Sequence, residues 1–298
     1  MKFTKRYETE SDYTSAKPKL ILPNVSLVSE SSKVYYNPKK AKLYDYLYSD
    51  LTYGTEVKDN IIGVCVIGEG ILPDKKARFI SIKPMSLSTP DVGGYSEVTF
   101  YWGGYGVDTS LKNLNKVVTG DTSASGYAID YSYLPKNGAY SLYTPHSPSP
   151  IDYFAAYSDT TVTTANSLSD FDGKSNTKVL TDLATAQSDW KTAAITNNSG
   201  SGYYPAACAC WRFNPGNTNQ GDWYLPAMGE LGFVIVNFDE INSKINAASG
   251  VQLNGGKYYW SSTEYDSDKA GSLYMDYGHV VGIPKNKASF FIRAFLAL

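Results

Sequence analysis

Helical periodicity is confined to two stretches of this 298-residue chain. The first follows residues 170–176, where Ser175 or Asn176 is expected to cap a helix, and its apolar residues recur at helical spacing: Val179, Leu180, Leu183, Trp190 and Ala194. The second opens at Leu225-Pro226, since proline suits a first helical turn, and its apolar stripe comprises Met228, Leu231, Ile235, Phe238, Ile241 and Ile245. Most of the remaining chain is therefore expected to be strand or loop.

Short apolar runs before and after these helices predict strands. Residues Ile61 to Ile67 form one candidate for a buried strand and Ala77 to Ile82 another, with a turn at 72–74 between them. Two more runs, 258–260 and 290–296, enclose a stretch of the chain without a clear pattern. Strands, helix, loops, helix and strands follow one another, which predicts an α+β fold. A hydrophobic content of 42% is sufficient for a sizeable core.

Two regions differ from this core in composition. Residues 91–169 are rich in Gly, Ser, Thr, Tyr and Pro, which predicts a loop-rich insertion within a main domain of residues 43–298. Residues 1–42 contain two strand-like runs, 25–28 and 33–36, around a Ser-Glu-Ser-Ser turn. Because a lone hairpin is marginally stable in water, we expect it to pack on the main domain or on a partner chain. Residues 1–42 are therefore predicted to be an attachment or oligomerisation segment.

Charge and hydropathy argue against binding to nucleic acid, insertion into a membrane and export by a signal peptide. The net charge is −2, which is not the charge expected of a protein that binds nucleic acid or an anionic membrane. No apolar run of about 18 residues is present, so we expect no membrane insertion. The N-terminus carries early positive charge without an apolar stretch behind it, so we expect no signal peptide and synthesis in the cytoplasm.

The three cysteines do not form a disulfide framework, because their number is odd and their spacing is irregular. Cys65 lies in an apolar run and is expected to be a core thiol. Cys208 and Cys210 leave open a metal site with a third ligand, but the chain has only two histidines to offer. We therefore expect neither a metal nor another cofactor.

Two short motifs near the first helix resemble nucleotide and calcium sites but are incomplete. Residues 173–175 read Gly-Lys-Ser, but the glycine that a phosphate-binding loop needs five residues earlier is Leu168 here. Asp170 and Asp172 resemble half of a calcium loop that lacks its other acidic ligands. A turn that leads into the helix is therefore the favoured interpretation of both aspartates.

No combination of residues points to catalysis. His146 lies in a Pro-rich loop and His279 in an expected hairpin turn, and neither accompanies a nucleophile motif. Asp239 and Glu240 are neighbours on a helix, so they cannot face each other as an acid–base pair and are expected to be solvated. The sequence predicts a protein that is not an enzyme.

Four separated motifs follow one another along the chain: DGKSNT at 172–177, GDWYLPAMGEL at 221–231, YWSSTE at 259–264 and IRAF at 292–295. Together they resemble the pattern of a group of bacterial and phage proteins with a C-type lectin-like fold. The group overlaps the variable proteins of diversity-generating retroelements, and the phage major tropism determinant is a relative in fold. The resemblance covers about residues 61–298. It implies a C-type lectin-like fold with two helices, a mixed or antiparallel sheet and long loop insertions.

The resemblance also implies roles for the motif residues. Trp223-Tyr224 would anchor the second helix to the sheet, and Trp260 would be a core aromatic. Residues 261–263 would hydrogen-bond to the backbone of an irregular strand. Glu230 and Arg293 are expected to meet as a structural charge pair. The Glu-Pro-Asn and Trp-Asn-Asp motifs of calcium-dependent sugar-binding lectins are missing, so the resemblance implies the scaffold without their metal ligands.

In the variable proteins the last strands and their loops display the binding site, which implies a variable region at residues 258–298 here. Adenine-directed change of Asn codons reaches residues such as Asp, Ser, Tyr, His and Val but not Lys or Met, so Lys269, Met275, Lys285 and Lys287 are expected to be fixed. Strand alternation predicts that Leu273 and Met275 face the core and that Ser272, Tyr274 and Asp276 face outward. The expected ligand-binding residues are Tyr265, Asp266, Asp268, Ser272, Tyr274, Asp276, Tyr277, His279, Val281, Ile283 and Phe290. An ordinary hairpin surface without diversification is the alternative.

Tyrosines among small polar residues are typical of binding surfaces, so we expect a non-enzymatic protein that binds a cell-surface protein or glycan. The first hypothesis is a phage or prophage receptor-binding protein, associated with the virion and trimeric at a tail-fibre tip. One alternative is a bacterial adhesin of the same fold displayed at the cell surface. The other is a structural lectin-fold protein without diversification.

Overall fold

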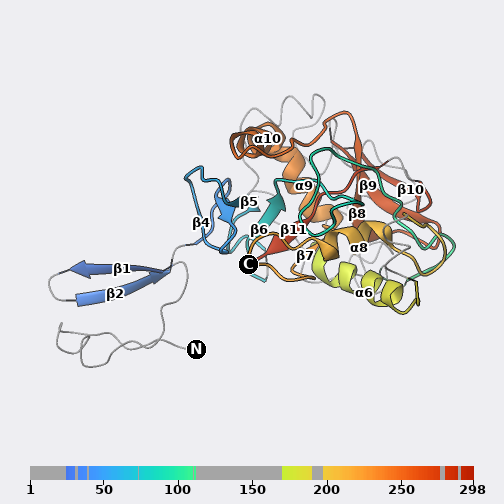
Figure 1. Cartoon of the computed structure of the whole chain (residues 1–298), viewed down its shortest axis with the longest axis horizontal. Coiled ribbons are helices and arrows are strands. Elements are labelled where there is room, and N and C mark those ends of the chain that lie inside the picture. Colours follow the sequence, from blue (N-terminus) through green and yellow to red (C-terminus); the bar gives the residue numbers. More distant parts are fainter. Residues whose placement is uncertain are drawn as a thin grey trace.

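The computed structural model describes residues 25–30, 33–38, 40–72, 74–109, 111, 170–189, 197–275, 279–287 and 290–298, with the backbone alone for 25–30, 33–38 and 279–281. Helices and antiparallel sheets together form the body of the molecule (Figure 1), which confirms the predicted α+β class. The helices in the described part are α6 (Gly173–Thr185), α8 (Pro205–Arg212), α9 (Met228–Val236) and α10 (Phe238–Ala247).

A six-stranded antiparallel sheet forms the centre of the fold. Its strand order is β4 (Tyr53–Gly54), β3 (Tyr46–Tyr48), β5 (Ile61–Ile67), β6 (Arg78–Ser81), β11 (Phe295–Ala297) and β7 (Trp223–Tyr224). The predicted strands at 61–67 and 77–82 are confirmed as β5 and β6. The strand predicted at 290–296 is shorter, because only β11 belongs to this sheet and Phe290 and Phe291 each form an isolated bridge.

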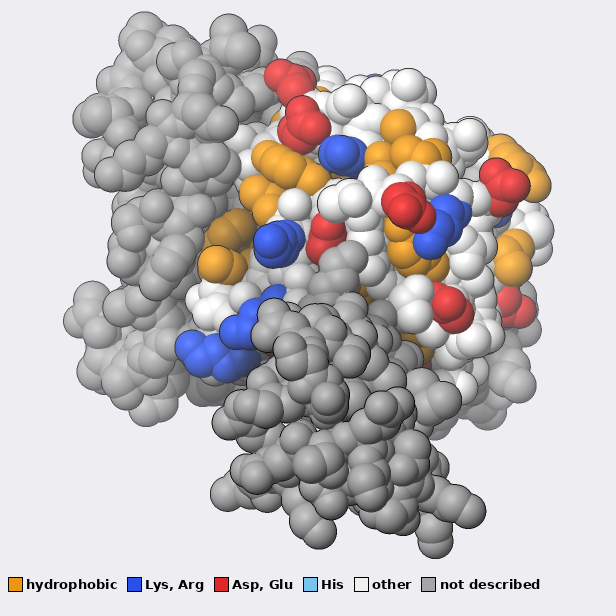
Figure 2. Space-filling model, turned by 90° about the vertical axis from the view of Figure 1, so that its left-hand side faces the viewer, with side chains coloured by type: hydrophobic (Ala, Val, Ile, Leu, Met, Phe, Trp, Pro, Cys, Tyr) orange, Lys and Arg blue, Asp and Glu red, His pale blue; other side chains and the backbone are white. Residues whose placement is uncertain are grey.

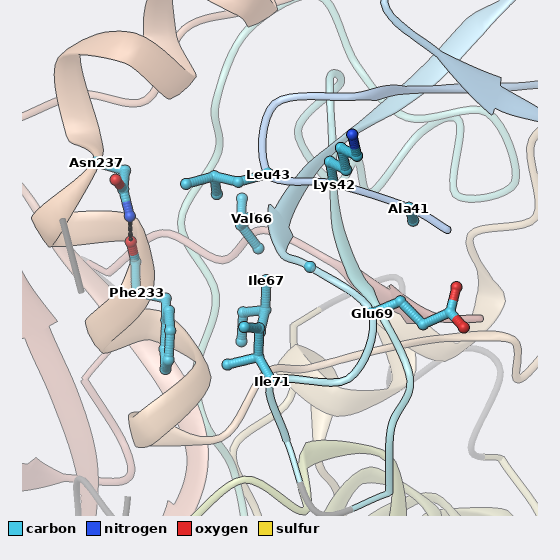
Figure 3. Close-up of a pocket in the computed structure, with 10 residues that line it drawn as sticks. Ala41, Lys42, Leu43, Val66, Ile67, Glu69, Ile71, Phe233 and Asn237 are labelled. Atoms are coloured by element: carbon cyan, nitrogen blue, oxygen red, sulfur yellow. Dashed lines mark hydrogen bonds between the residues drawn. The ribbon is translucent and has the colours of Figure 1, made fainter. Parts of the chain in front are cut away.

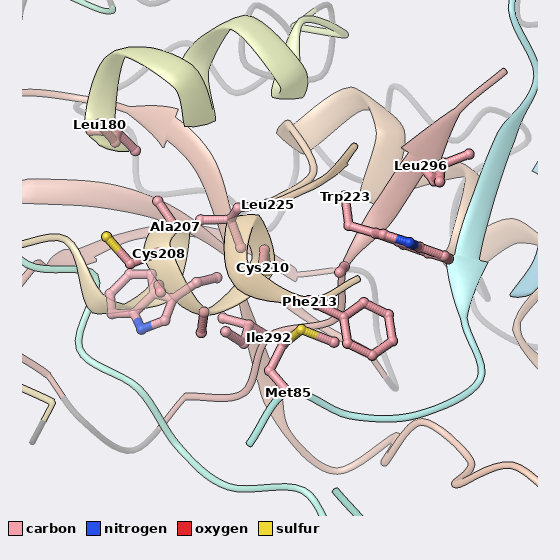
Figure 4. Close-up of a cluster of buried hydrophobic side chains, with 14 of the residues drawn as sticks. Met85, Leu180, Ala207, Cys208, Cys210, Phe213, Trp223, Leu225, Ile292 and Leu296 are labelled. Atoms are coloured by element: carbon pink, nitrogen blue, oxygen red, sulfur yellow. The ribbon is translucent and has the colours of Figure 1, made fainter. Parts of the chain in front are cut away.

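Both faces of this sheet are covered, which explains why β5 is apolar along its whole length. On one face Val64 and Val66 pack with the apolar side chains of α9 and α10. On the other face Cys65 belongs to a second cluster. This cluster includes Leu180 of α6 and Cys208 of α8, which Figure 4 labels. The central strands therefore do not alternate between apolar and polar residues.

A second antiparallel sheet has the order β10 (His279–Pro284), β9 (Lys269–Tyr274) and β8 (Tyr258–Glu264). Its register shifts between Trp260 and Glu264, as the resemblance implied for an irregular strand. Tyr259 and Leu273 belong to the same apolar cluster as α9, whereas Trp260 belongs to the cluster of α8. The second sheet thus lies between the two clusters, as the first does.

The first predicted helix begins earlier than expected. α6 starts at Gly173 after Asp172, so Ser175 and Asn176 lie inside the helix and do not cap it. Asn176 is held there by hydrogen bonds from its side-chain amide to Asp170 and Ser262. A Cβ on Gly173 would lie 2.6 Å from the backbone N of Ala227 and would also collide with Glu230 Oε2, so this first helical position requires glycine unless the backbone shifts. Trp190 and Ala194 lie outside the described residues.

The second predicted helix is divided into α9 and α10 at Asn237, and all six residues of its predicted stripe are buried. Pro226 precedes the first turn, as expected. The N-terminal N–H groups of α9 are satisfied by side chains, because Ala227 N–H donates to Glu230 Oε2 and Met228 N–H donates to Thr263 Oγ1. Asp239 and Glu240 are exposed, as predicted.

A further helix, α8, was not predicted. It places Cys208 and Cys210 two residues apart, about 200° around the helix axis, so the two thiols cannot approach a common ion. Both side chains are buried among apolar neighbours (Figure 4). Burial raises the pKa of Cys208 to about 12. Cys65 is also buried, which confirms the prediction of a core thiol.

The N-terminal hairpin is confirmed as β1 (Val25–Glu30) and β2 (Lys33–Pro38), which pair with each other in a sheet of their own. The role of residues 1–42 in attachment or assembly remains a prediction. Most of the expected insertion at 91–169 lies outside the described residues. No helix in the described part of the chain has the length and apolarity that crossing a membrane requires.

Candidate binding surface

Most of the predicted ligand-binding residues that the structure describes lie near one end or the other of the β8–β9–β10 sheet, whereas Ser272 and Val281 pair in its middle. At one end Tyr274 pairs with Tyr258 of β8 and with His279 of β10. At the other end Ala270 pairs with Glu264 and Ile283, next to the turn that contains Asp266 and Asp268. β9 has five residue steps of about 3.4 Å, so the two ends are about 17 Å apart. A small ligand therefore contacts one end, whereas a macromolecule can span both.

Three half-buried aromatic rings gather at the first end. The ring centroids of Tyr258 and Tyr274 are 4.8 Å apart, and those of Tyr258 and Phe290 are 5.0 Å apart. Beneath them the ring of Trp260, which is fully buried, packs edge-on against Phe290 at 4.8 Å. We call Tyr258, Tyr274 and Phe290 the aromatic group. Its rings rest on one another and on the core, so they are positioned before any ligand arrives.

Tyr258 was not among the predicted site residues, because the sequence analysis assigned it to the structural strand. Its position opposite Tyr274 follows from the register of β8 and β9. The sequence would predict this pairing only if the length of the turn between the two strands were known, because that length sets the register.

The second end of the sheet is a tight turn whose polar groups hydrogen-bond within the protein. Asp266 Oδ1 accepts hydrogen bonds from the backbone N–H groups of Asp268 and Lys269 at 2.8 and 2.7 Å. Gly106 N–H donates to Ser267 O, and Lys285 N–H donates to Asp268 O. Asp266 therefore shapes the turn, and the exposed side chain is that of Asp268.

Two predicted site residues are buried, and their expected exposure is corrected. Tyr265 is 5% exposed because its ring packs on Gly282, where an added Cβ would lie 2.5 Å from the ring. Ser272 is fully buried because the side of the sheet that carries Trp260 is covered by the second apolar cluster. Leu273 and Met275 are buried, as predicted.

The other predicted site residues differ in how far the structure describes them. Asp266, Tyr274, Ile283 and Phe290 are partly exposed. The structure describes only the backbone of His279 and Val281, and His279 is the first residue of β10. Asp276 and Tyr277 lie outside the described residues, as does His146.

A buried ion pair connects this sheet to a distant segment of the chain. Lys285 Nζ lies 2.6 Å from Glu264 Oε1, and both side chains are fully buried. Lys285 Nζ also donates to Val107 O at 2.7 Å and lies 4.9 Å from the ring centre of Trp102. The remaining acceptor capacity of Glu264 is used by Thr109 N–H, Thr109 Oγ1 and Leu111 N–H. Burial lowers the pKa of Lys285, and the Glu264 carboxylate partly opposes that effect.

The motif around Asp170 joins α6, α9 and β8. Asp170 Oδ2 accepts hydrogen bonds from Asn176 Nδ2 at 3.0 Å and from Thr263 Oγ1 at 2.8 Å. Asp170 Oδ1 accepts one from Asp172 N–H, which supports the interpretation of a turn that leads into the helix. Burial raises the pKa of Asp170 to about 6 although these donors favour the charged form. Asp170 thus connects residues of three of the sequence motifs, through Asn176, Thr263 and the Met228 N–H that donates to Thr263, in one set of hydrogen bonds.

The predicted charge pair of Glu230 and Arg293 is wrong. Glu230 Oε1 accepts hydrogen bonds from Arg78 Nε at 2.7 Å and from Tyr224 OH at 2.8 Å. Arg293 instead donates to Glu97 Oε1 at 2.6 Å. Each charge therefore has a partner from a segment that the four motifs do not include. Burial raises the pKa of Glu230 to about 7, and Arg78 opposes this rise.

Ligand classes that need a strongly charged surface or a metal find little support in the described residues. On the side of the molecule away from the β8–β9–β10 sheet, which Figure 2 shows, lysine, arginine and acidic side chains are scattered over the described residues without a broad field of one sign. Among the residues that the structure describes, no three His, Cys, Asp or Glu side chains form a metal-ligand group. The described surface of the sheet offers aromatic rings and turn carboxylates.

Comparison with known proteins gives a likeness in fold. No family model matches the chain, and no curated protein matches it. The structure is similar to the crystal structure of a fimbrial protein from Bacteroides ovatus ATCC 8483, with a TM-score of 0.50 and 14% sequence identity. The similarity covers 86% of this chain and 49% of that one, so the chain spans about half the length of the fimbrial protein. At this identity the likeness concerns the fold alone.

Proposed function

We propose that this chain is a non-enzymatic binding protein that presents the end of the β8–β9–β10 sheet to a ligand on another cell. The observation that carries the proposal is the aromatic group, whose half-buried rings lie 4.8–5.0 Å apart above the buried Trp260. Aromatic rings fixed by packing offer large contact area at a low entropic cost, which is typical of binding surfaces.

The hydrogen-bonded interior supports this assignment. The Lys285–Glu264 pair and the Asp170 network hold β8 and the end of β10 from the inside, so the outer side chains of these strands can differ without loss of the fold. That separation is what a diversified surface requires. The expected C-type lectin-like fold and the retroelement-type variable region belong to the same proposal, and they rest on the four sequence motifs.

Between the two settings, we favour a bacterial adhesin displayed at the cell surface over a phage tail-fibre protein. The similarity in fold to a fimbrial protein supports this choice. A tail-fibre receptor-binding protein is the second candidate, and it rests on the resemblance of the sequence to the variable proteins.

Binding to intact cells and to a panel of immobilised glycans tests the proposal. We expect Tyr274→Ala and Tyr258→Ala to reduce binding at least tenfold while the protein remains folded. Leu183→Ala is the matched control, because Leu183 is an exposed apolar residue on α6. Equal binding by all three variants would refute the assignment of this surface.

A separate observation tests diversification. We expect the DNA next to the gene to encode a reverse transcriptase. We also expect it to contain a near-copy of the segment that encodes residues 258–298, with additional adenines. If the near-copy differs outside the predicted variable codons, the retroelement hypothesis is wrong, whereas the binding surface is unaffected. Adjacent tail genes would instead favour the phage setting.

A further inference from the structure

An apolar groove lies where the chain enters the body (Figure 3). Its volume is about 260 Å³, and Leu43, Val66, Ile67, Ile71 and Phe233 provide most of its lining. Lys42 and Glu69 stand at the rim, and both are exposed. The groove thus has an apolar floor between two opposite charges.

The polar residue in the lining is already engaged within the protein. Asn237 Oδ1 accepts a hydrogen bond from Tyr44 OH at 2.8 Å, and Asn237 Nδ2 donates to Phe233 O at 2.9 Å. The volume is also below the range of about 300–1,000 Å³ that is usual for small-molecule pockets. These features suit one or two apolar side chains of a protein segment.

The N-terminal hairpin has a face of the matching kind. In its register Leu27 pairs with Tyr36, Val25 with Pro38, and Ser29 with Val34, so five of these six residues on one face of the ribbon are apolar. The alternate positions are Ser26, Val28, Glu30, Lys33, Tyr35 and Asn37, which are mostly polar. A two-stranded sheet with one apolar face is marginally stable in water unless that face is covered.

The hairpin is poorly placed to cover the groove of its own chain. β2 ends at Pro38, and the groove begins at Ala41, so the three steps between them span at most about 11 Å. The segment from Ala41 onward is fixed beside β5, because Glu69 N–H donates to Ala41 O and Tyr44 N–H donates to Cys65 O. To lie across the groove of its own chain, the hairpin would therefore have to fold back within the short link between Pro38 and Ala41.

We propose that the apolar face of the β1–β2 hairpin of a second copy of this chain docks in this groove. The contact joins two different surfaces, so it is head-to-tail, and repetition of it produces rings or open chains rather than only a closed dimer. The proposal does not depend on the ligand of the β8–β9–β10 sheet.

Complementation between two variants of the full chain tests this contact by sedimentation velocity. Ile71→Glu places a charge in the groove, and Leu27→Glu places one on the apolar face of the hairpin. We expect the wild type to associate with rising concentration and each variant to sediment as a monomer. An equimolar mixture is expected to form dimers and nothing larger, because each variant supplies the surface that the other lacks. Leu183→Glu on α6 is the control and is expected to associate as the wild type does.

Paired cysteines provide a second measurement that does not require a buried charge. Leu27→Cys and Ile71→Cys in two differently tagged chains are expected to form a disulfide between chains on mild oxidation. The native cysteines are buried, so they do not compete. A monomeric wild type at all concentrations, or a mixture that stays monomeric, would overturn the proposal. A third sample is the double variant Leu27→Cys/Ile71→Cys. If its disulfide forms only within one chain and never between chains, the proposal is also wrong.

Discussion

Removal of Lys285 and removal of Glu264 are expected to lower the free energy of unfolding by different amounts, although the two residues form one buried ion pair. Removal of one partner of a buried ion pair costs about 3–5 kcal/mol, because the other charge is left buried and uncompensated. In Lys285→Met, Glu264 retains the three donors from Thr109 and Leu111, so we expect a loss of about 3 kcal/mol. In Glu264→Gln, the Lys285 ammonium retains Val107 O and the face of Trp102, so we expect about 4–5 kcal/mol.

The measurement is urea unfolding followed by tryptophan fluorescence, with Trp102 next to the pair as one of the reporters. The double variant Lys285→Met/Glu264→Gln is expected to lose about 2 kcal/mol less than the sum of the single variants, since neither charge is then stranded. Losses below about 1 kcal/mol in both single variants, or a larger loss in Lys285→Met than in Glu264→Gln, would refute this account of the pair.

Three further predictions concern the interior and the aromatic group. Trp260→Ala is expected to cost about 3–5 kcal/mol of unfolding free energy, whereas Tyr274→Ala costs about 1 kcal/mol because its ring is only half-buried; similar losses in chemical denaturation would contradict the assignment of core and surface. Gly173→Ala is expected to lower the melting temperature more than Gly68→Ala, since a Cβ at Gly68 meets its nearest atom, Ala41 O, at an ordinary contact distance of 3.5 Å and the one at Gly173 collides with Glu230 and Ala227; the reverse order in calorimetry would contradict the role of Gly173. Burial raises the pKa of Asp170 to about 6, so the folded state binds a proton that the unfolded state has released, and this residue's contribution to stability falls as the pH rises from about 4 to about 6. The stability of Asp170→Asn is therefore expected to have a more positive slope with pH in that window than the wild type, and parallel curves would speak against the shift.

The sequence predicted the elements whose signal is local. β5 was predicted with its observed bounds, because a strand that is buried on both faces is a continuous apolar run. The stripe of α9 and α10 was also correct, because its apolar residues recur over several turns. α8 was not predicted, because its eight residues are mostly alanine and cysteine and are too few to show a helical period.

What the sequence could not supply depends on contacts between distant segments. Alternation correctly separated Ser272 from Leu273, but it does not tell whether a side of the sheet is covered, and here another part of the chain covers Ser272. Glu230 and Arg293 were matched because both lie in recognisable motifs. Their partners, Arg78 and Glu97, lie in segments without a motif, so only the three-dimensional structure identifies them.

The position of β11 has a consequence for the synthesis of the protein. This strand lies between β6 and β7, and it is formed by Phe295 to Ala297. Until the ribosome has released these residues, β6 and β7 have no common neighbour, and the six-stranded sheet remains in two parts with open edges. Open edges invite pairing with other chains. A cell that makes this protein therefore has to protect the two open parts of the sheet until β11 is available, and products that stop before Phe295 are expected to aggregate.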